Sequence, residues 1–210
     1  MVNYSSFALV NNAGIAKADP IELQPIEDFK QQMDVNLFGV VLVIQQFIPI
    51  LRKYNGRIIN ISSISGISSL PFKGTYGATK FALEAISSAL RLELKPWKIS
   101  ISNVLPSATQ TPTWSKALAV ADKMLENWKL EELRMYGPIV DMMKKIAAEP
   151  HGIDPDKVAF AVAKLLRGKN PKSRVLVGKQ AIFLAFIEKF PTRIRDWIIF
   201  RQLPKYGEIK

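Results

Sequence analysis

Tyr76 and Lys80 are the two residues whose types and spacing best support chemistry. On a helix, residues four apart share one face. A phenol has a pKa near ~10 and is a poor base at neutral pH, but a neighbouring ammonium favours the phenolate and lowers that pKa. Tyr76 is therefore a candidate general acid and base, with Lys80 as its tuning group. The hydroxyl of Ser63 can hydrogen-bond the carbonyl or alcohol oxygen on which Tyr76 acts.

Alternating strands and helices must position these residues. Short apolar runs bounded by turn residues predict strands, and apolar residues at helical spacing predict helices. The predicted strands are 7–10, 57–62, 99–105 and 174–177. The predicted helices are 25–51, 76–94 and 155–167, and residues 113–148 are expected to be mostly helical. This alternation predicts an α/β fold whose mainly parallel sheet is covered by helices on both faces.

Composition excludes several classes of protein. With 210 residues, 48% of them apolar, the chain is expected to be globular and to form one domain rather than two. The absence of Cys excludes a disulfide scaffold and thiolate zinc sites, and one His cannot form a histidine cluster. We therefore expect no metal.

The net charge of +11 is unevenly distributed. Residues 167–210 contain eleven Lys and Arg against three acidic residues, so this basic segment carries about +8 of the total. Such a segment indicates either an anionic partner or a solvated surface. No nucleic-acid-binding motif accompanies the charge, and we expect no nucleic-acid partner.

Membrane signals are confined to one segment. No apolar run approaches the ~20 residues that span a bilayer, and the N-terminus does not resemble a secretory signal, so a cytoplasmic location is expected. In 181–201, bulky apolar residues interleave with Lys and Arg, which suits peripheral contact with a membrane surface. Pro191 should divide this segment into two short helices. The alternative is that these helices pack on the protein's own core.

The order of motifs resembles the short-chain dehydrogenase/reductase family. The resemblance runs from about Phe7 to Val177, and residues 154–177 with the basic segment look loosely like the retinol- and steroid-oxidising branch. The motifs that carry it are Leu9-Val10-Asn11-Asn12-Ala13-Gly14, Asn36 within 34–39, Gly56-Arg57-Ile58-Ile59-Asn60-Ile61-Ser62-Ser63, Tyr76-Gly77-Ala78-Thr79-Lys80, and Pro106.

The resemblance implies a Rossmann-like doubly wound sheet and an NAD or NADP cofactor. The family's catalytic tetrad would be Asn36, Ser63, Tyr76 and Lys80, with Ser63 preferred to Ser62 because it precedes Tyr76 by the family's usual thirteen residues. Lys80 would also hydrogen-bond the nicotinamide ribose, and Asn36 would hold a water that links Lys80 to solvent.

The remaining cofactor contacts follow from the same resemblance. Tyr76 and Lys80 would face the nicotinamide end of the cofactor. The other expected contacts are Asn12, Ala13 and Gly14 on the adenosine side, and Pro106, Thr109 and Thr111 near the carboxamide. The family usually has Pro-Gly where this chain has Pro106-Ser107.

The family's Gly-rich pyrophosphate loop has no counterpart in these residues. The eleven glycines are scattered, no Gly-x-Gly occurs, and the chain starts where the family's fourth strand would start. We therefore expect a Rossmann-like sheet lacking its first strands, in a fragment or mis-started form of an enzyme that is inactive alone. The alternative is a non-catalytic remnant that binds a membrane surface or a protein partner.

The substrate and assembly are also inferred from the resemblance. Residues 113–148, rich in Met, Trp and Leu, occupy the place of the family's substrate lid, which suits a lipophilic alcohol or carbonyl compound. They could equally be the core of a helical subdomain. Helices 25–54 and 76–95 resemble the pair through which the family usually dimerises, so a homo-oligomer is expected. The predicted organisation is a partial dinucleotide-binding domain, 1–178, followed by a basic amphipathic C-terminal segment, 179–210.

Overall fold

The computed structural model describes residues 7–110, 125–126, 128–148 and 152–201. Within them, four strands form one sheet in the order β1-β2-β3-β4, and every neighbouring pair is parallel. The strands are β1 (Ala8–Asn11), β2 (Arg57–Ile61), β3 (Ser100–Pro106) and β4 (Arg174–Val177). The α/β class and the parallel sheet expected from the sequence are confirmed.

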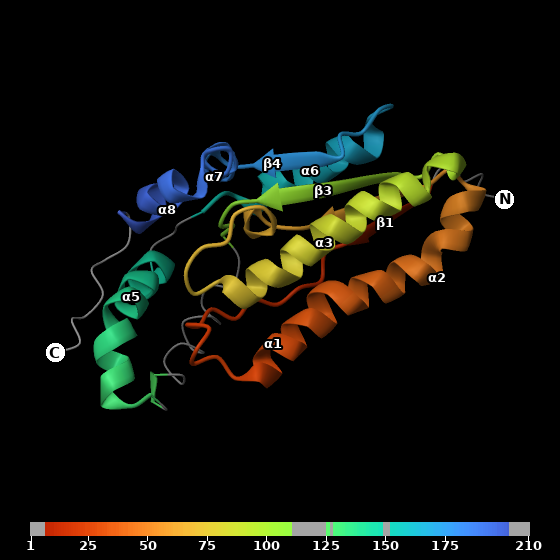
Figure 1. Ribbon diagram of the computed structural model, residues 1–210. Helices are drawn as coiled ribbons and strands as arrows, with labels where there is room; N and C mark the ends of the chain where they lie inside the picture. The colour runs from red at the N-terminus through yellow and green to blue at the C-terminus, as the bar shows by residue number, and fades with distance from the viewer. Residues whose placement is uncertain (1–6, 111–124, 127, 149–151, 202–210) are drawn as a thin grey trace. The chain divides into compact units, whose positions relative to one another are not determined.

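Helices connect the strands as parallel pairing requires. Figure 1 shows the long helix formed by α1, η1 and α2 lying beside α3. The helices that accompany the sheet are α1 (Ile26–Met33), η1 (Asp34–Phe38), α2 (Gly39–Lys53), α3 (Gly74–Glu93), α6 (Pro155–Arg167) and α7 (Lys179–Ile187). Two short 3₁₀ turns, η2 (Ile64–Gly66) and η3 (Lys95–Trp97), lie between them.

The turn between α2 and β2 shows how local sequence ends a helix. Asn55 adopts a left-handed conformation with φ of 46°, which Asn tolerates better than most residues. The Gly56 N–H then bonds the Leu51 carbonyl at 2.8 Å. A Cβ atom at Gly56 would lie 2.5 Å from Leu51 Cδ2 and 2.8 Å from the Phe7 carbonyl oxygen. Close packing therefore requires glycine here.

Apolar side chains cover both faces of the two central strands. Ile58 and Ile101 are paired in register and belong to the core beneath α2 and α3. Ile59 and Val104 point to the opposite face, because successive strand residues alternate, and they too are buried. On that face, Arg57 donates to the Leu165 and Gly168 carbonyls at the end of α6. The sheet is thus covered on both sides.

One row of polar side chains crosses all four strands. Asn11 pairs with Asn60, Asn60 with Asn103, and Asn103 with Arg174. The Asn11 amide donates to Asn60 at 2.8 Å, and the Asn60 amide donates to Asn103 at 3.3 Å and to Ser87 of α3 at 3.0 Å. The row therefore connects the sheet to the helix that carries Tyr76 and Lys80.

The chain forms two compact units. The first comprises residues 1–107 and 156–185, and the second comprises 108–155 and 186–210. The second contains α5 (Leu130–Ala148) and α8 (Thr192–Phe200). Separate helices on either side of Pro191 confirm the predicted interruption. Much of the predicted helical region 113–148 falls outside the described residues, and the division after residue 178 stays a prediction.

The helix Ile26–Lys53 is a candidate membrane span, although it contains no long uninterrupted apolar run. By length and composition it could cross a bilayer, with 28% of its most apolar window buried. A helix that packs one apolar face on a sheet passes the same test. The expected absence of a spanning segment and the cytoplasmic location therefore stay predictions.

Candidate active site

Helix α3 presents Tyr76 and Lys80 from its first two turns. Lys80 is 4% exposed, and its Nζ donates to the Ile61 carbonyl, where β2 ends, at 3.1 Å. The same nitrogen lies 5.7 Å from the centroid of the Tyr76 ring. The spacing of four residues thus brings phenol and ammonium together on one helix face, as the sequence indicates.

Burial disfavours the charged form of both groups and so shifts the pKa of each. Desolvation lowers the pKa of Lys80 to about 8, and the carboxylate of Glu84 opposes that fall. Desolvation raises the pKa of Tyr76, while a hydrogen bond with Ser63 lowers it. In this structure the group acting against the rise is therefore Ser63, and tuning of Tyr76 by Lys80 stays a prediction.

Ser63 sits where the loop after β2 turns into η2. Its side chain caps η2 by accepting from the Ser65 N–H at 3.1 Å, and it also hydrogen-bonds Tyr76. The neighbouring Ser62 hydroxyl has no partner within the described residues and packs 3.0 Å from where a Cβ of Gly66 would stand. The structure thus brings Ser63, rather than Ser62, to Tyr76.

Asn36 lies in a π-helical segment, η1, which interrupts the helix formed by α1 and α2. Such segments are frequent at functional sites. Its completely buried amide accepts from the Ile15 N–H at 2.8 Å and donates to the Ile15 carbonyl at 2.8 Å and to Thr79 at 3.1 Å. These bonds hold the loop after β1 against α3. Because they engage the side-chain donors, the water-holding role stays a prediction.

Residues 12–14 form the exposed loop that follows β1. A Cβ at Gly14 would lie 3.3 Å from Asn36 Oδ1 and 3.7 Å from Lys80 Nζ, so the loop backbone passes directly over the site. Lys80 uses one of its three N–H donors on Ile61, and the described part of the chain offers it no second hydrogen-bond partner. The remaining Lys80 donors fit the ribose of a dinucleotide, and the adenosine-side role of residues 12–14 stays a prediction.

The expected carboxamide contacts are divided between the two units, and their role stays a prediction. Pro106 ends β3, and the Ser107 N–H that follows donates to the Val177 carbonyl at 2.9 Å. Thr109 belongs to the second unit, where it bridges to Ile153. Thr111 lies outside the described residues. Of the three, Pro106 is the one in the same unit as the tetrad.

Two residues of the site escaped the sequence analysis. Thr79 accepts from Asn36 and donates to the Tyr76 carbonyl at 2.8 Å, so it connects two tetrad members. Glu84 follows Lys80 by one helical turn and influences its pKa. The spacing of Glu84 from Lys80 could have revealed it, whereas nothing in the sequence indicates the role of Thr79.

Comparisons with known proteins find relatives that match most of this chain. A model of the family described as short chain dehydrogenase matches residues 7–121. The chain is 33% identical to 3-amino-tetrahydro-pyrrolizinone reductase of Xenorhabdus hominickii, over 99% of this chain and 74% of that protein. It is 36% identical to 3-ketodihydrosphingosine reductase of Bacteroides thetaiotaomicron, over 81% of this chain and 62% of that protein.

A solved structure shares the fold. A short chain dehydrogenase from Burkholderia cenocepacia, in complex with NADP, superposes with a TM-score of 0.70 at 23% identity. The match covers 94% of this chain and 69% of that one.

Proposed function

Because the chain belongs to the short-chain dehydrogenase/reductase family, we propose that it serves the NAD(P)-dependent interconversion of an alcohol and a ketone or aldehyde. The observation that carries the proposal is the convergence of Asn36, Ser63, Tyr76 and Lys80 within one unit. Two strand ends, a π segment and one helix are needed to bring these four residues together.

Three of the four side chains act directly in the proposed reaction. In the reducing direction, Tyr76 gives its hydroxyl proton to the substrate oxygen, and Ser63 hydrogen-bonds the same oxygen. The Lys80 ammonium stabilises the phenolate left behind. A bound dinucleotide would supply the hydride from its nicotinamide, with Lys80 at the nicotinamide ribose and residues 12–14 along the adenosine side. The Tyr76 phenol is protonated at neutral pH, but burial raises its pKa and makes the proton harder to release, so the Ser63 hydrogen bond and the Lys80 charge must offset that rise.

We propose a lipophilic substrate. The relative named for 3-ketodihydrosphingosine supports this class, as does the Met- and Trp-rich composition of 113–148.

Activity requires that the dinucleotide pyrophosphate be anchored by a Gly-rich strand–turn–helix, which these 210 residues do not contain. The competing proposal, a non-catalytic member that binds a membrane or protein, keeps the same site without turnover.

Turnover of NADPH and NADH separates the two proposals. The protein, and a chimera carrying the Gly-rich βα units of a relative ahead of Phe7, are assayed at 340 nm with long-chain 3-keto substrates. Tyr76→Phe should lower turnover by about 10²-fold or more, because it removes the proton donor. The matched variant Tyr54→Phe, at the C-terminus of α2, should retain it. Undiminished turnover in Tyr76→Phe would contradict the catalytic role.

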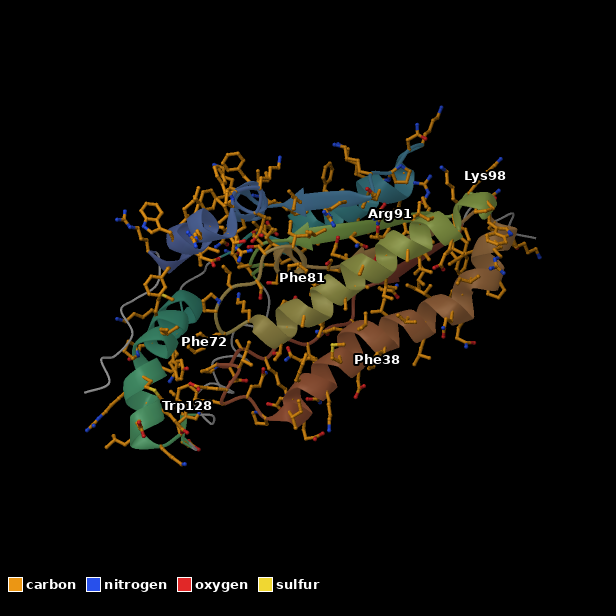
Figure 2. All side chains as sticks on the ribbon, in the orientation of Figure 1. Phe38, Phe72, Phe81, Arg91, Lys98 and Trp128 are labelled. Carbon is orange, nitrogen blue, oxygen red and sulfur yellow. The ribbon has the colours of Figure 1, made fainter. Side chains whose placement is uncertain are left out.

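We also propose that the family's dimerising helices pair here. Large apolar side chains are exposed along them, and Figure 2 shows Phe38 and Phe81 on the neighbouring long helices. The exposed set on these helices comprises Ile26, Phe38, Leu42, Val43, Phe47, Phe81 and Leu92. Leu42→Glu should shift sedimentation equilibrium toward the monomer, whereas Leu166→Glu on α6 should not. A monomeric unmodified protein would refute the pairing.

Peripheral membrane contact is a second candidate property, favoured by the exposed end of segment 181–201. Phe186, Ile194, Trp197 and Phe200 are exposed, and Arg201 lies 4.1 Å from the Trp197 ring centroid. Aromatic and cationic side chains together suit an anionic bilayer surface. Co-sedimentation with anionic vesicles should fall in Trp197→Glu and be absent with neutral vesicles. Equal binding by the protein and a chain ending at Gly178 would remove this segment from the proposal.

A further inference from the structure

A buried carboxylate outside the tetrad lies one helical turn beyond Lys80. Glu84 is 7% exposed, and both of its oxygens are engaged. Oε1 accepts from the Asn103 amide at 2.8 Å, and Oε2 accepts from Arg174 Nε at 2.9 Å and Nη2 at 2.7 Å. Charge-assisted bonds from a guanidinium fork fix the carboxylate in position.

Lys80 and Glu84 occupy the same stretch of α3, where the loop after β2 packs against the helix. A Cβ at Gly66 would lie 3.1 Å from the Lys80 carbonyl oxygen and 3.1 Å from Glu84 Cγ. The loop backbone therefore closes over this stretch and keeps it from solvent. Both charges act through a medium of low dielectric, where Coulomb interactions are stronger than in water.

Few charged groups face Lys80 within the described residues. Helix α3 contributes Tyr76 and Glu84, and β4 contributes Arg174, which reaches Glu84. The parts of η1, η2, β2 and β3 that pack here present Asn and Ser side chains and backbone carbonyls. After burial itself, Glu84 is the charge that acts on Lys80 within the described residues, and Arg174 is the ion-pair partner of that carboxylate.

We propose that Glu84 is a positioning residue for Lys80, holding it in the ammonium form, and that Arg174 sets the strength of this effect. The proposal rests on the proposed function of the tetrad, in which Lys80 must carry a positive charge to hold the ribose and stabilise the phenolate. The Glu84–Arg174 pair would thus couple the sheet edge to the reaction.

The directions of the pKa shift agree with this geometry. Burial alone lowers the pKa of Lys80, and Glu84 is the group that raises it. Without Glu84 the pKa should fall further and leave part of the population neutral near physiological pH. Without Arg174 the carboxylate loses its counter-charge, and the pKa of Lys80 should rise.

Opposite shifts distinguish this role from a merely structural ion pair. The full chain, labelled with ¹³C at lysine Cε, is titrated by NMR, and the Lys80 signal is assigned by its loss in Lys80→Arg. Glu84→Gln should lower the Lys80 midpoint, and Arg174→Gln should raise it, each by about half a unit or more. No shift in Glu84→Gln, or shifts of the same sign, would overturn the proposal.

The experiment remains decisive if one variant fails to fold. Circular dichroism identifies such a variant, and the sign of the shift in the other then supports or refutes the role alone. The titration needs no turnover. An unchanged Lys80 midpoint, or shifts of the same sign, therefore refutes the role of Glu84 and leaves the proposed oxidoreductase function standing. Opposite shifts in a protein whose chimera with the Gly-rich βα units shows no turnover would instead count against the proposed function.

Discussion

Lys80 should destabilise the fold at neutral pH, and replacing it should reveal by how much. Its pKa of about 8 lies well below the ordinary lysine value of 10.5. Each pKa unit corresponds to ~1.4 kcal/mol, so burying the ammonium costs about 3 kcal/mol. Lys80→Met removes that cost but leaves the Ile61 carbonyl without its donor, worth about 1 kcal/mol. The variant should therefore be about 2 kcal/mol more stable at pH 7.

The pH dependence gives this prediction its sign. Because the folded pKa is the lower one, the unfolded chain binds more protons between about pH 8 and pH 10.5, and stability rises with pH through that window. The difference between Lys80→Met and the unmodified chain should therefore shrink as the pH rises.

Urea unfolding at pH 7, 8.5 and 10, followed by circular dichroism, measures the difference. Lys53→Met, an exposed change at the end of α2, is the control and should show no comparable gain at any pH. A loss of stability in Lys80→Met at pH 7, or a gain that does not change with pH, would refute the reasoning.

Three further predictions concern packing and binding. Gly56→Ala should lower the free energy of unfolding by about 1–3 kcal/mol in urea, because its methyl group meets Leu51; an unchanged midpoint would contradict the packing. Asn36→Leu should cost about 2–3 kcal/mol in the same assay, since both polar groups of Ile15 lose their partner; a neutral effect would argue against those bonds. In calorimetry, these 210 residues alone should bind NADPH weakly, and micromolar affinity would show that the Gly-rich turn is dispensable.

Patterns local in sequence predicted most of the fold. Residues 174–177 were expected as a strand and form β4 unchanged, because a short apolar run between turn residues has few alternatives. Tyr76 and Lys80 share a face because their spacing is set by helix geometry. The predicted end of the helix before Gly56 follows from the left-handed conformation that Asn55 tolerates.

Features that depend on distant contacts could not be predicted. The π segment around Asn36 exists in a helix whose sequence shows ordinary periodicity, and its amide is engaged by Ile15 and Thr79 from elsewhere in the chain. The division of the chain into two units, with Thr109 in the second, is likewise set by contacts between residues distant in sequence. Spacing along the chain carries no information about such tertiary placement.

The polar row across the sheet also discriminates against misfolded strand pairings. Sliding β2 past β3 by one residue would turn its side chains to the wrong face, and sliding by two would set Asn60 opposite Ile101 or Leu105. Either register buries amides without partners, at about 1–3 kcal/mol for each group. Leucines in the row could preserve packing, yet they would remove this penalty and permit a mixture of registers. The asparagines thus make the native sheet unique as well as stable.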